Sequence, residues 1–159
     1  MLVHKLDFTD FSSSAYTLIA IHTVLNDYRL AYILNKTLNC EFKRCDFDID
    51  KTEKYTQKHK VKALFSVYRY TSSEYCFFLI SNRYKYNNKM CQTTLFSENF
   101  SLSYLVPEMK KVNYFIKIEG ITENGFLEIL KKKINQIPQV SFCYKIDLKT
   151  LKSKDFLIF

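Results

Sequence analysis

The sequence predicts an α+β fold in which two helices lie on one side of a largely antiparallel sheet. Two strand–helix–strand units lead to this prediction, one over residues 16–47 and the other over residues 112–147. A β-rich insertion with a predicted hairpin separates them. Because a ferredoxin-like or ACT-like sandwich has this element order, we expect that arrangement in a single domain over residues 1–159.

Composition narrows the class of protein. The chain has 159 residues, of which 47% are hydrophobic, enough for one core. No apolar run approaches the roughly 20 residues that cross a bilayer, and the start MLVHKLDF lacks the pattern of a signal peptide. The five cysteines form no CxxC pair, which argues against a disulfide framework or a zinc site. We therefore expect a cytoplasmic protein without a membrane span, metal or cofactor.

The net charge of +8 favours a polyanionic partner such as RNA. Arginine, however, occurs only at Arg29, Arg44, Arg69 and Arg83, while lysine, asparagine, isoleucine, phenylalanine and tyrosine are abundant. An A+T-rich genome produces the same profile whatever the protein does. The position of the charges is therefore more informative than their sum.

The first unit begins with residues 16–22, whose uninterrupted run LIAI is typical of a central strand buried on both faces. Thr23 is predicted to cap a helix that runs to residue 38. Its expected apolar face consists of Val24, Leu25, Tyr28, Ala31, Tyr32, Leu34 and Leu38. Residues 40–47 should form the next strand.

A candidate ligand pocket lies at the start of this helix. His22 ends the central strand just before Thr23, where α/β crevices collect ligands and backbone N–H groups attract anions. Asn35 falls inside the apolar face by angle, and Arg29 falls outside it. The alternative interpretations are a structural histidine and an asparagine that bonds a loop backbone.

Residues 49–60 are polar and unpatterned, so we expect an exposed linker or a short frayed helix. Residues 61–70 and 75–84 then alternate as a hairpin, with Tyr70 opposite Tyr75 and Lys62 opposite Arg83. One predicted face, which should join the core, holds Ala63, Phe65, Val67, Phe78 and Ile80.

The second face of this hairpin combines aromatic rings at the turn with cations at the open end. Aromatic side chains on a sheet stack on bases, and neighbouring cations neutralise phosphates, so this face is the candidate surface for RNA or a protein partner. Alternatively, the rings pack against a helix and the lysines protect a sheet edge. The face comprises Lys60, Lys62, Tyr68, Tyr70, Tyr75, Phe77, Arg83, Lys85 and Tyr86.

Residues 106–114 read VPEMKKVNY and join the insertion to the second unit. Pro107 should end a strand over residues 101–106, and residues 112–119 alternate as the next strand. Glu108 lies in the tight connection, where a carboxylate usually bonds backbone N–H groups or a lysine. A functional carboxylate is the alternative.

This segment resembles the signature of the IPExxxVDY family of small bacterial proteins. Pro107, Glu108, Val112 and Tyr114 match it, Val106 takes the place of isoleucine, and Asn113 that of aspartate. The resemblance continues through HKLDF, LIAIHTVLNDYRLAYILNKTL and LKSKDFLIF. The family has no established activity, so the resemblance implies no function. If its aspartate were catalytic, an amide at Asn113 would impair the chemistry.

The second unit continues with a helix from Thr122 to about residue 137, whose apolar face is Phe126, Leu127, Leu130, Ile134 and Ile137. Lys133 falls within this face by angle, so its stem should lie along the core while its amine reaches solvent. A strand over residues 142–147 follows. Residues 156–159 should pack as a last short strand.

These patterns favour a non-catalytic cytoplasmic binding or adaptor protein that recognises RNA, or an RNA-processing or ribosomal partner, through the hairpin face. The alternative is an ACT-like sensor that binds an anionic metabolite near His22 and Thr23. An enzyme ranks third, because the sequence shows no nucleophile with a base and an orienting group, nor histidines at metal-ligand spacing. Monomer and homodimer are both open.

Overall fold

The computed structural model describes residues 16–56, 59–87, 100–120 and 123–159. In this part of the chain the main sheet has six strands in the order β10-β1-β9-β6-β5-β2, with every neighbouring pair antiparallel. The strands are β1 (Tyr16–Thr23), β2 (Lys43–Arg44), β5 (Val67–Thr71), β6 (Cys76–Ser81), β9 (Tyr114–Glu119) and β10 (Val140–Ile146).

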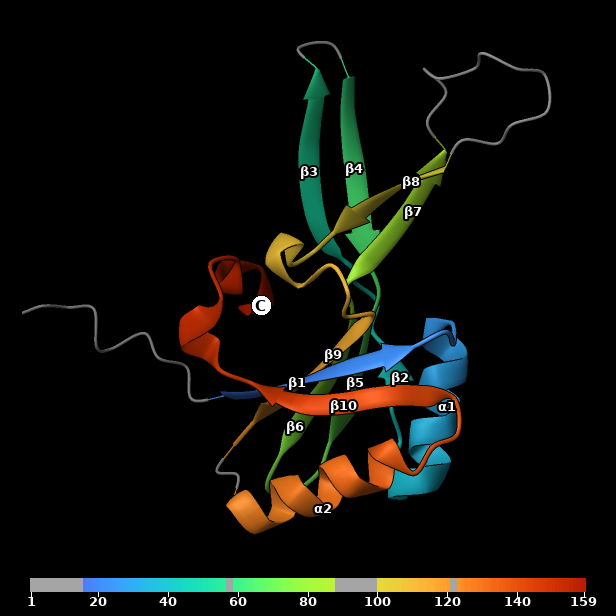
Figure 1. The fold of residues 1–159 in the computed structure, drawn as a ribbon, viewed down its shortest axis with the longest axis vertical. Helices are drawn as coiled ribbons and strands as arrows, with labels where there is room; N and C mark the ends of the chain where they lie inside the picture. Colours follow the sequence, from blue (N-terminus) through green and yellow to red (C-terminus); the bar gives the residue numbers. More distant parts are fainter. Residues whose placement is uncertain (1–15, 57–58, 88–99, 121–122) are drawn as a thin grey trace, which may run out of the picture.

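Both faces of this sheet are covered. The helices α1 (Asp27–Leu38) and α2 (Asn124–Asn135) pack on one face (Figure 1). On the other face lie the segment 105–112 and two 3₁₀ turns, Leu148–Thr150 and Lys154–Leu157. The prediction of α+β structure with a largely antiparallel sheet is confirmed. The expected last strand at residues 156–159 is wrong, because the chain there forms a turn that buries Leu157.

The central strand has the two-sided burial that its sequence predicts. Leu18, Ile19, Ala20 and Ile21 are all 0% exposed, and β1 lies between β10 and β9. Ile19 and Ile21 belong to the core under the helices, whereas Leu18 and Ala20 belong to the core on the opposite face. A strand that supplies both cores cannot carry polar side chains over this length.

The helix α1 begins later than predicted. Asn26, not Thr23, is its N-cap, because the Thr23 hydroxyl accepts from the Leu25 N–H (3.1 Å) and donates to the Gln139 carbonyl (2.7 Å). The turn over residues 23–26 also changes which side of the helix faces the sheet. Leu30, Ala31 and Leu34 are buried, while Val24, Tyr28 and Tyr32 of the predicted face are exposed.

The α2 helix agrees more closely with its sequence prediction, because Leu127, Leu130 and Ile134 are buried as expected. Its N-cap is Glu123, and the predicted cap Thr122 lies outside the described residues. HKLDF near the start also lies outside them. No helix in the described ranges is long and apolar enough to span a membrane.

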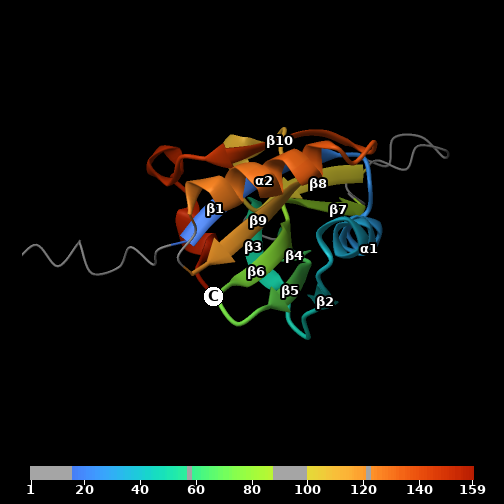
Figure 2. The same cartoon turned by 90° about the horizontal axis from the view of Figure 1, so that it is seen from below.

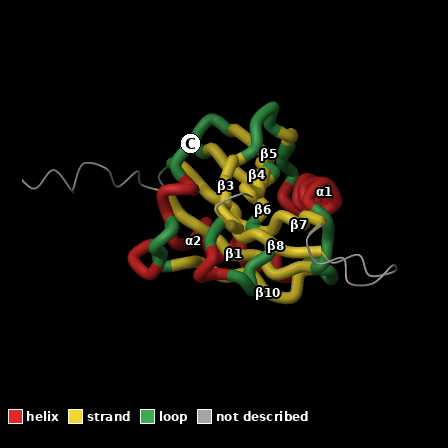
Figure 3. Tube along the Cα trace, turned by 90° about the horizontal axis from the view of Figure 1, so that it is seen from above, coloured by secondary structure: helices red, strands yellow, loops and turns green. Residues whose placement is uncertain are grey.

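Two β-hairpins project from one end of the main sheet, at the top of Figure 1 and toward the viewer in Figure 3. The first pairs β3 (Ile49–Thr56) with β4 (His59–Phe65), so the linker or helix predicted for residues 49–60 is wrong. The second pairs β7 (Arg83–Asn87) with β8 (Phe100–Tyr104). The strand predicted at residues 40–47 shrinks to β2, a two-residue strand at the sheet edge.

The predicted hairpin of residues 61–84 exists only at its turn end. Ser72 pairs with Tyr75 through its N–H (2.9 Å) and hydroxyl, so the register is shifted by two residues and Tyr70 lies opposite Phe77. Beyond Ser66 and Asn82 the strands separate into different hairpins. Lys62 therefore lies opposite Thr52, and Arg83 lies opposite Tyr104.

Asn82 lies directly after β6, where the chain leaves the main sheet, and its hydrogen bonds fix the chain at this position. Its side chain is 0% exposed, and both its amide nitrogen and its amide oxygen form hydrogen bonds with the loop that follows β8. Its backbone N–H and carbonyl also bond this loop, so each of its polar groups is satisfied. The partners are the carbonyls of Met109 (2.9 Å), Val112 (3.0 Å) and Asn113 (2.9 Å), and the N–H groups of Val106 (2.8 Å) and Leu105 (3.1 Å).

We predict that Asn82→Ala lowers the free energy of unfolding by about 3 kcal/mol, because it leaves the Val112 carbonyl and the Val106 N–H buried without a partner. The Met109 carbonyl also loses a hydrogen bond but still accepts from the Val112 N–H. Asn87→Ala is the control, since Asn87 is an exposed asparagine of the neighbouring strand, and it should change stability by less than about 0.5 kcal/mol. Urea unfolding followed by circular dichroism measures both. Equal effects of the two changes would contradict the role of Asn82.

The two glycines predict opposite responses to alanine. Gly120 has φ +119°, and an added Cβ would lie 2.6 Å from the Glu74 carbonyl oxygen, whereas a Cβ at Gly125 meets nothing within 4 Å. Gly120→Ala should therefore cost about 2 kcal/mol through strain and a clash. Gly125→Ala, in the first turn of α2, should stabilise by about 0.5 kcal/mol. Thermal unfolding of both variants tests the difference in sign.

Candidate functional site

The aromatic half of the predicted binding face lies under the helices. Phe77 is 7% exposed, and the Tyr75 ring stacks on Phe126 of α2 with 4.9 Å between centroids. Tyr68 and Tyr70 pack against the same core. These rings therefore pack against a helix, which is the alternative that the sequence left open. They do not share a surface with the predicted cations.

The other residues of that face are dispersed. Lys62 pairs with Asp50 (3.0 Å) on the β3–β4 hairpin, and the side chain of Lys60 lies outside the described residues. Tyr86 stacks on Tyr84 with centroids 6.5 Å apart. Only Arg83 and Lys85 stay together, on one side of β7. A candidate site built on these two cations needs other aromatic partners.

The β7–β8 hairpin supplies them. Its pairing places Arg83, Lys85 and Asn87 opposite Tyr104, Leu102 and Phe100, so these six side chains share one side, called here the ribbon face. Phe100 is 45% exposed and Leu102 is 47% exposed. Arg83, Lys85 and Asn87 are exposed as well, and Tyr104 is half-buried. The ribbon face thus places two cations of β7 opposite apolar and aromatic side chains of β8.

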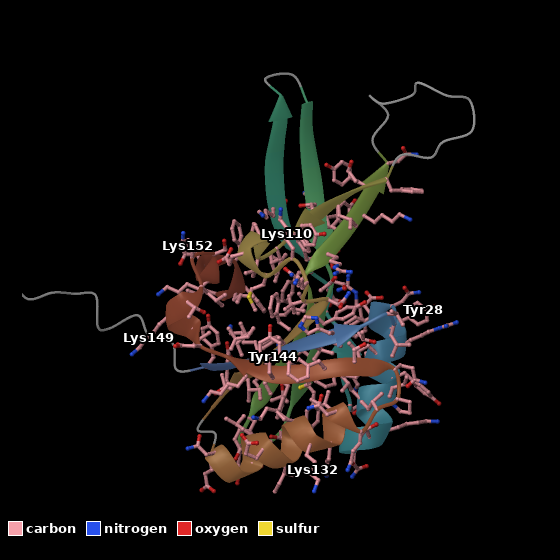
Figure 4. The ribbon with its side chains drawn as sticks, in the orientation of Figure 1. Tyr28, Lys110, Lys132, Tyr144, Lys149 and Lys152 are labelled. Atoms are coloured by element: carbon pink, nitrogen blue, oxygen red, sulfur yellow. The ribbon has the colours of Figure 1, made fainter. Side chains whose placement is uncertain are left out.

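The cations of this region lie over the rings. Lys85 Nζ is 3.7 Å from the Phe100 ring centroid, and Lys110 Nζ is 5.9 Å from that of Tyr104. Arg83 Nη2 donates to the Lys110 carbonyl (3.1 Å), which joins β7 to the loop after β8. Figure 4 shows Lys110 near the base of the hairpin. None of the residues of the ribbon face is acidic, so its local charge is positive.

The hairpin is anchored to the rest of the molecule from its other side. Tyr84 packs edge-on against Phe65 of β4, with centroids 6.3 Å apart, and Lys51 Nζ donates to the Tyr104 carbonyl (2.6 Å). A groove of about 310 Å³ continues from Arg83 to the start of α1, where Asp27 and Tyr28 line it. The surface available to a partner therefore extends beyond the hairpin itself.

Glu108 fastens the loop after β8 to the segment after β10. Its Oε1 accepts from the N–H groups of Lys152 and Ser153 (both 2.7 Å), and its Oε2 accepts from the Ser153 hydroxyl (2.9 Å). Burial acts to raise the pKa of Glu108, but these hydrogen bonds outweigh it and hold the pKa below its usual value. The geometry matches the predicted connector carboxylate that bonds backbone N–H groups.

The other signature residues are also occupied by structural contacts. Pro107 opens a 3₁₀ turn after the extended residue Val106, and Val112 is 1% exposed. The Tyr114 hydroxyl donates to the Leu25 carbonyl (2.9 Å), and burial raises the pKa of Tyr114. These contacts position the loop against the sheet.

Asn113 shows why an amide is acceptable where the resembled family has aspartate. Its Oδ1 accepts from the Thr23 N–H (3.1 Å), and its own N–H donates to the Ile21 carbonyl (3.1 Å). A carboxylate oxygen accepts the first hydrogen bond equally well. The role visible at this position is to hold the end of β1, and it requires no proton transfer.

The residues of the predicted ligand pocket face different surroundings. His22 stacks on Tyr144, with centroids 5.7 Å apart, on the side of the sheet away from the helices. Asn35 Oδ1 accepts from the Phe42 N–H (2.7 Å), and its Nδ2 donates to the Phe42 carbonyl, so it bonds a loop backbone. Arg29 is exposed beside Tyr28. The Thr23 hydroxyl is occupied as described above.

Sequence reasoning missed Phe100, Leu102 and Lys110. It placed a strand near residues 101–106 but did not pair that strand with residues 83–87, because residues 88–99 separate the two segments without a turn signal. The alternation of Phe100, Leu102 and Tyr104 with serine was the available signal.

A scan against protein-family models and a search of curated proteins found no match to this chain. The resemblance to the IPExxxVDY family therefore stays a prediction.

We predict that Glu108→Gln lowers stability at pH 7 by about 1 kcal/mol, because the amide keeps only one acceptor and the site is exposed enough for solvent to weaken the hydrogen bonds. The folded-state pKa is lowered, so the contribution of the carboxylate is full above its unfolded pKa, roughly 4.3, and is lost as the pH falls through the folded pKa.

The difference in the free energy of unfolding between wild type and Glu108→Gln should therefore become smaller as the pH is lowered below 4. Urea unfolding at several pH values measures this difference. Glu128→Gln is the control, because Glu128 makes only an exposed ion pair with Lys131. A stability difference that grows as the pH falls would contradict the role given to the Glu108 carboxylate.

Proposed function

We propose that this protein is a non-catalytic, cytoplasmic binding protein that recognises single-stranded RNA through the ribbon face. The observation that supports the proposal is the placement of Arg83 and Lys85 opposite the side chains of β8, among which Phe100 is 45% exposed and Tyr104 is half-buried. Exposed aromatic rings stack on bases, and adjacent cations neutralise phosphates. A duplex presents no unstacked bases, which is why single strands fit this surface better.

The spacing on β8 suits several nucleotides. Phe100 and Tyr104 lie four residues apart on the same side of the strand, which corresponds to about 14 Å along it. Lys85 and Lys110 lie over these two rings. The groove toward the start of α1 is lined by Asp27, whose carboxylate repels phosphate, so we expect the strand to follow the hairpin and not this groove. Binding by stacking and charge is tolerant of sequence, so we expect little base preference.

We further propose a ferredoxin-like description of the core. The antiparallel order β10-β1-β9-β6, with α1 following β1 and α2 preceding β10, supports it. The strands β5 and β2 extend this core at one edge. Such a fold carries RNA binders, enzymes and sensors, so the proposal for function depends on the ribbon face and not on the fold.

The alternative hypothesis, a sensor of an anionic metabolite near His22 and Thr23, has less support. The Thr23 hydroxyl already donates to the Gln139 carbonyl, and the His22 ring stacks on Tyr144. An anion there would have to compete with these contacts.

The first test is fluorescence anisotropy with a labelled oligouridine RNA at 50–200 mM salt. Phe100→Ala should weaken binding about tenfold, through loss of one stacked base. Lys85→Ala should reduce the slope of log K against log salt by about one phosphate contact.

Lys132→Ala is the control, since Lys132 is an exposed lysine of α2 on another part of the surface (Figure 4), and it should leave affinity and slope nearly unchanged. The proposal is wrong if the wild-type protein fails to bind RNA at micromolar concentration in 50 mM salt, or if Lys132→Ala weakens binding as much as Lys85→Ala does.

A further inference from the structure

An aromatic groove opens on the helix side of the sheet, distant from the ribbon face. It lies between α2, the turn end of the β5–β6 hairpin and the chain that follows α1, on the side that Figure 2 views. Its volume is about 190 Å³. The surrounding residues include several rings of the helix-side core, so the groove continues that core to the surface.

Aromatic rings in one connected cluster line the groove. Tyr75 and Phe126 stack nearly parallel, with 9° between their planes. Phe42 packs against Tyr70 (6.1 Å between centroids) and Phe77 (6.5 Å). Phe77 joins the two pairs, because it also contacts Tyr75 (6.0 Å) and Phe126 (6.3 Å). The wall of the groove is therefore apolar and largely aromatic.

Exposed apolar surface marks the mouth of the groove. Ile129 lines it and is 60% exposed, on a helix whose neighbouring residue Leu130 is only 6% exposed. An aliphatic side chain in this position gains from contact with an apolar ligand that displaces water.

The volume limits the size of that ligand. An apolar cavity of about 150 Å³ is large enough to hold benzene, and drug-sized ligands usually occupy about 300–1,000 Å³. A groove of 190 Å³ thus accepts one six-membered ring with a short substituent. Larger ring systems would extend into solvent.

The charge at the mouth of the groove narrows the class of ligand further. Lys133 is the one charged residue among those that line the groove. Its neighbour Lys131 is paired with Glu128 (2.6 Å), whereas Lys133 has no acidic partner in the described part of the chain. Lys133 is exposed, so a carboxylate bound at the mouth would neutralise its amine in an ion pair that water partly screens.

We propose that this groove binds a small aromatic carboxylate. The ring lies between the Tyr75–Phe126 stack and Tyr70, and the carboxylate pairs with Lys133. This site is separate from the ribbon face and does not depend on RNA binding. Lys133, which was predicted to fall within the apolar face of α2, is exposed and meets apolar surface at this groove.

The test is a titration with 3-phenylpropionate, followed by isothermal calorimetry and by ¹H–¹⁵N chemical shifts. For a ligand of this size we expect a Kd of about 0.1–1 mM. The neutral analogue 3-phenylpropanol should bind about threefold more weakly, because the ion pair with the exposed Lys133 is partly screened, and acetate, which has no ring, should not bind. Shifts should be confined to residues that line the groove.

Matched variants separate the groove from general charge. Lys133→Gln should weaken 3-phenylpropionate about threefold and abolish the preference over the alcohol, whereas Lys132→Gln, on the adjacent exposed lysine outside the groove, should change neither. Ile129→Glu places a negative charge at the mouth and should remove binding. Because Ile129 is 60% exposed, this variant should keep its melting temperature and two-dimensional spectrum.

The proposal is overturned by equal affinity for acid and alcohol, by equal effects of Lys132→Gln and Lys133→Gln, or by the absence of shifts in the groove at 5 mM ligand. Failure of RNA binding leaves this result untouched, since the two sites share no residue.

Discussion

The hydrogen bonds of Asn82 determine how the chain is arranged beyond the main sheet. A fully buried amide costs free energy unless its nitrogen and oxygen are both paired, and Asn82 meets this requirement only with the loop after β8 in place. Its backbone bonds the same loop at Leu105 and Asn113. The strand β6 therefore ends where this loop begins to pack, and the following residues must pair elsewhere.

The candidate binding surface follows from this constraint. Arg83 comes directly after Asn82, and Lys110 comes directly after Met109, whose carbonyl accepts from the Asn82 amide. The same network thus brings two distant cations together, and Arg83 Nη2 donates to the Lys110 carbonyl at 3.1 Å. Because β7 leaves the sheet, its outer side chains meet those of β8 and not those of β5. A basic and aromatic surface results from the need to satisfy one buried amide.

Burial on both faces of the main sheet leaves little free surface there. Lys117 of β9 shows how strictly the second face is covered, since it is 2% exposed. Its Nζ pairs with Glu119 (2.6 Å) and lies 4.6–5.4 Å from the ring centroids of Tyr16, Phe78 and Phe159. An ion pair together with several rings compensates the desolvation of such an amine. Partners are therefore expected at the hairpins and at the groove beside α2, where apolar and charged groups are still exposed together.

The sequence by itself determined the elements whose signals are local. The unbroken apolar run of β1 and the spacing of Leu127, Leu130 and Ile134 in α2 are signals within a short stretch of chain, so they predicted structure correctly. Pro107 does begin a 3₁₀ turn, but β8 already ends at Tyr104 and not at the predicted residue 106. The tertiary structure decided which strands pair. An alternating strand such as β7 is equally compatible with β4 or β8, and the choice depends on contacts of Asn82 with residues more than 20 positions away. It also decided which rings are buried, because the turn before α1 rotated the helix and brought Tyr28 and Tyr32 to the surface. Alternation fixes which side chains share a face, but only packing fixes what covers that face.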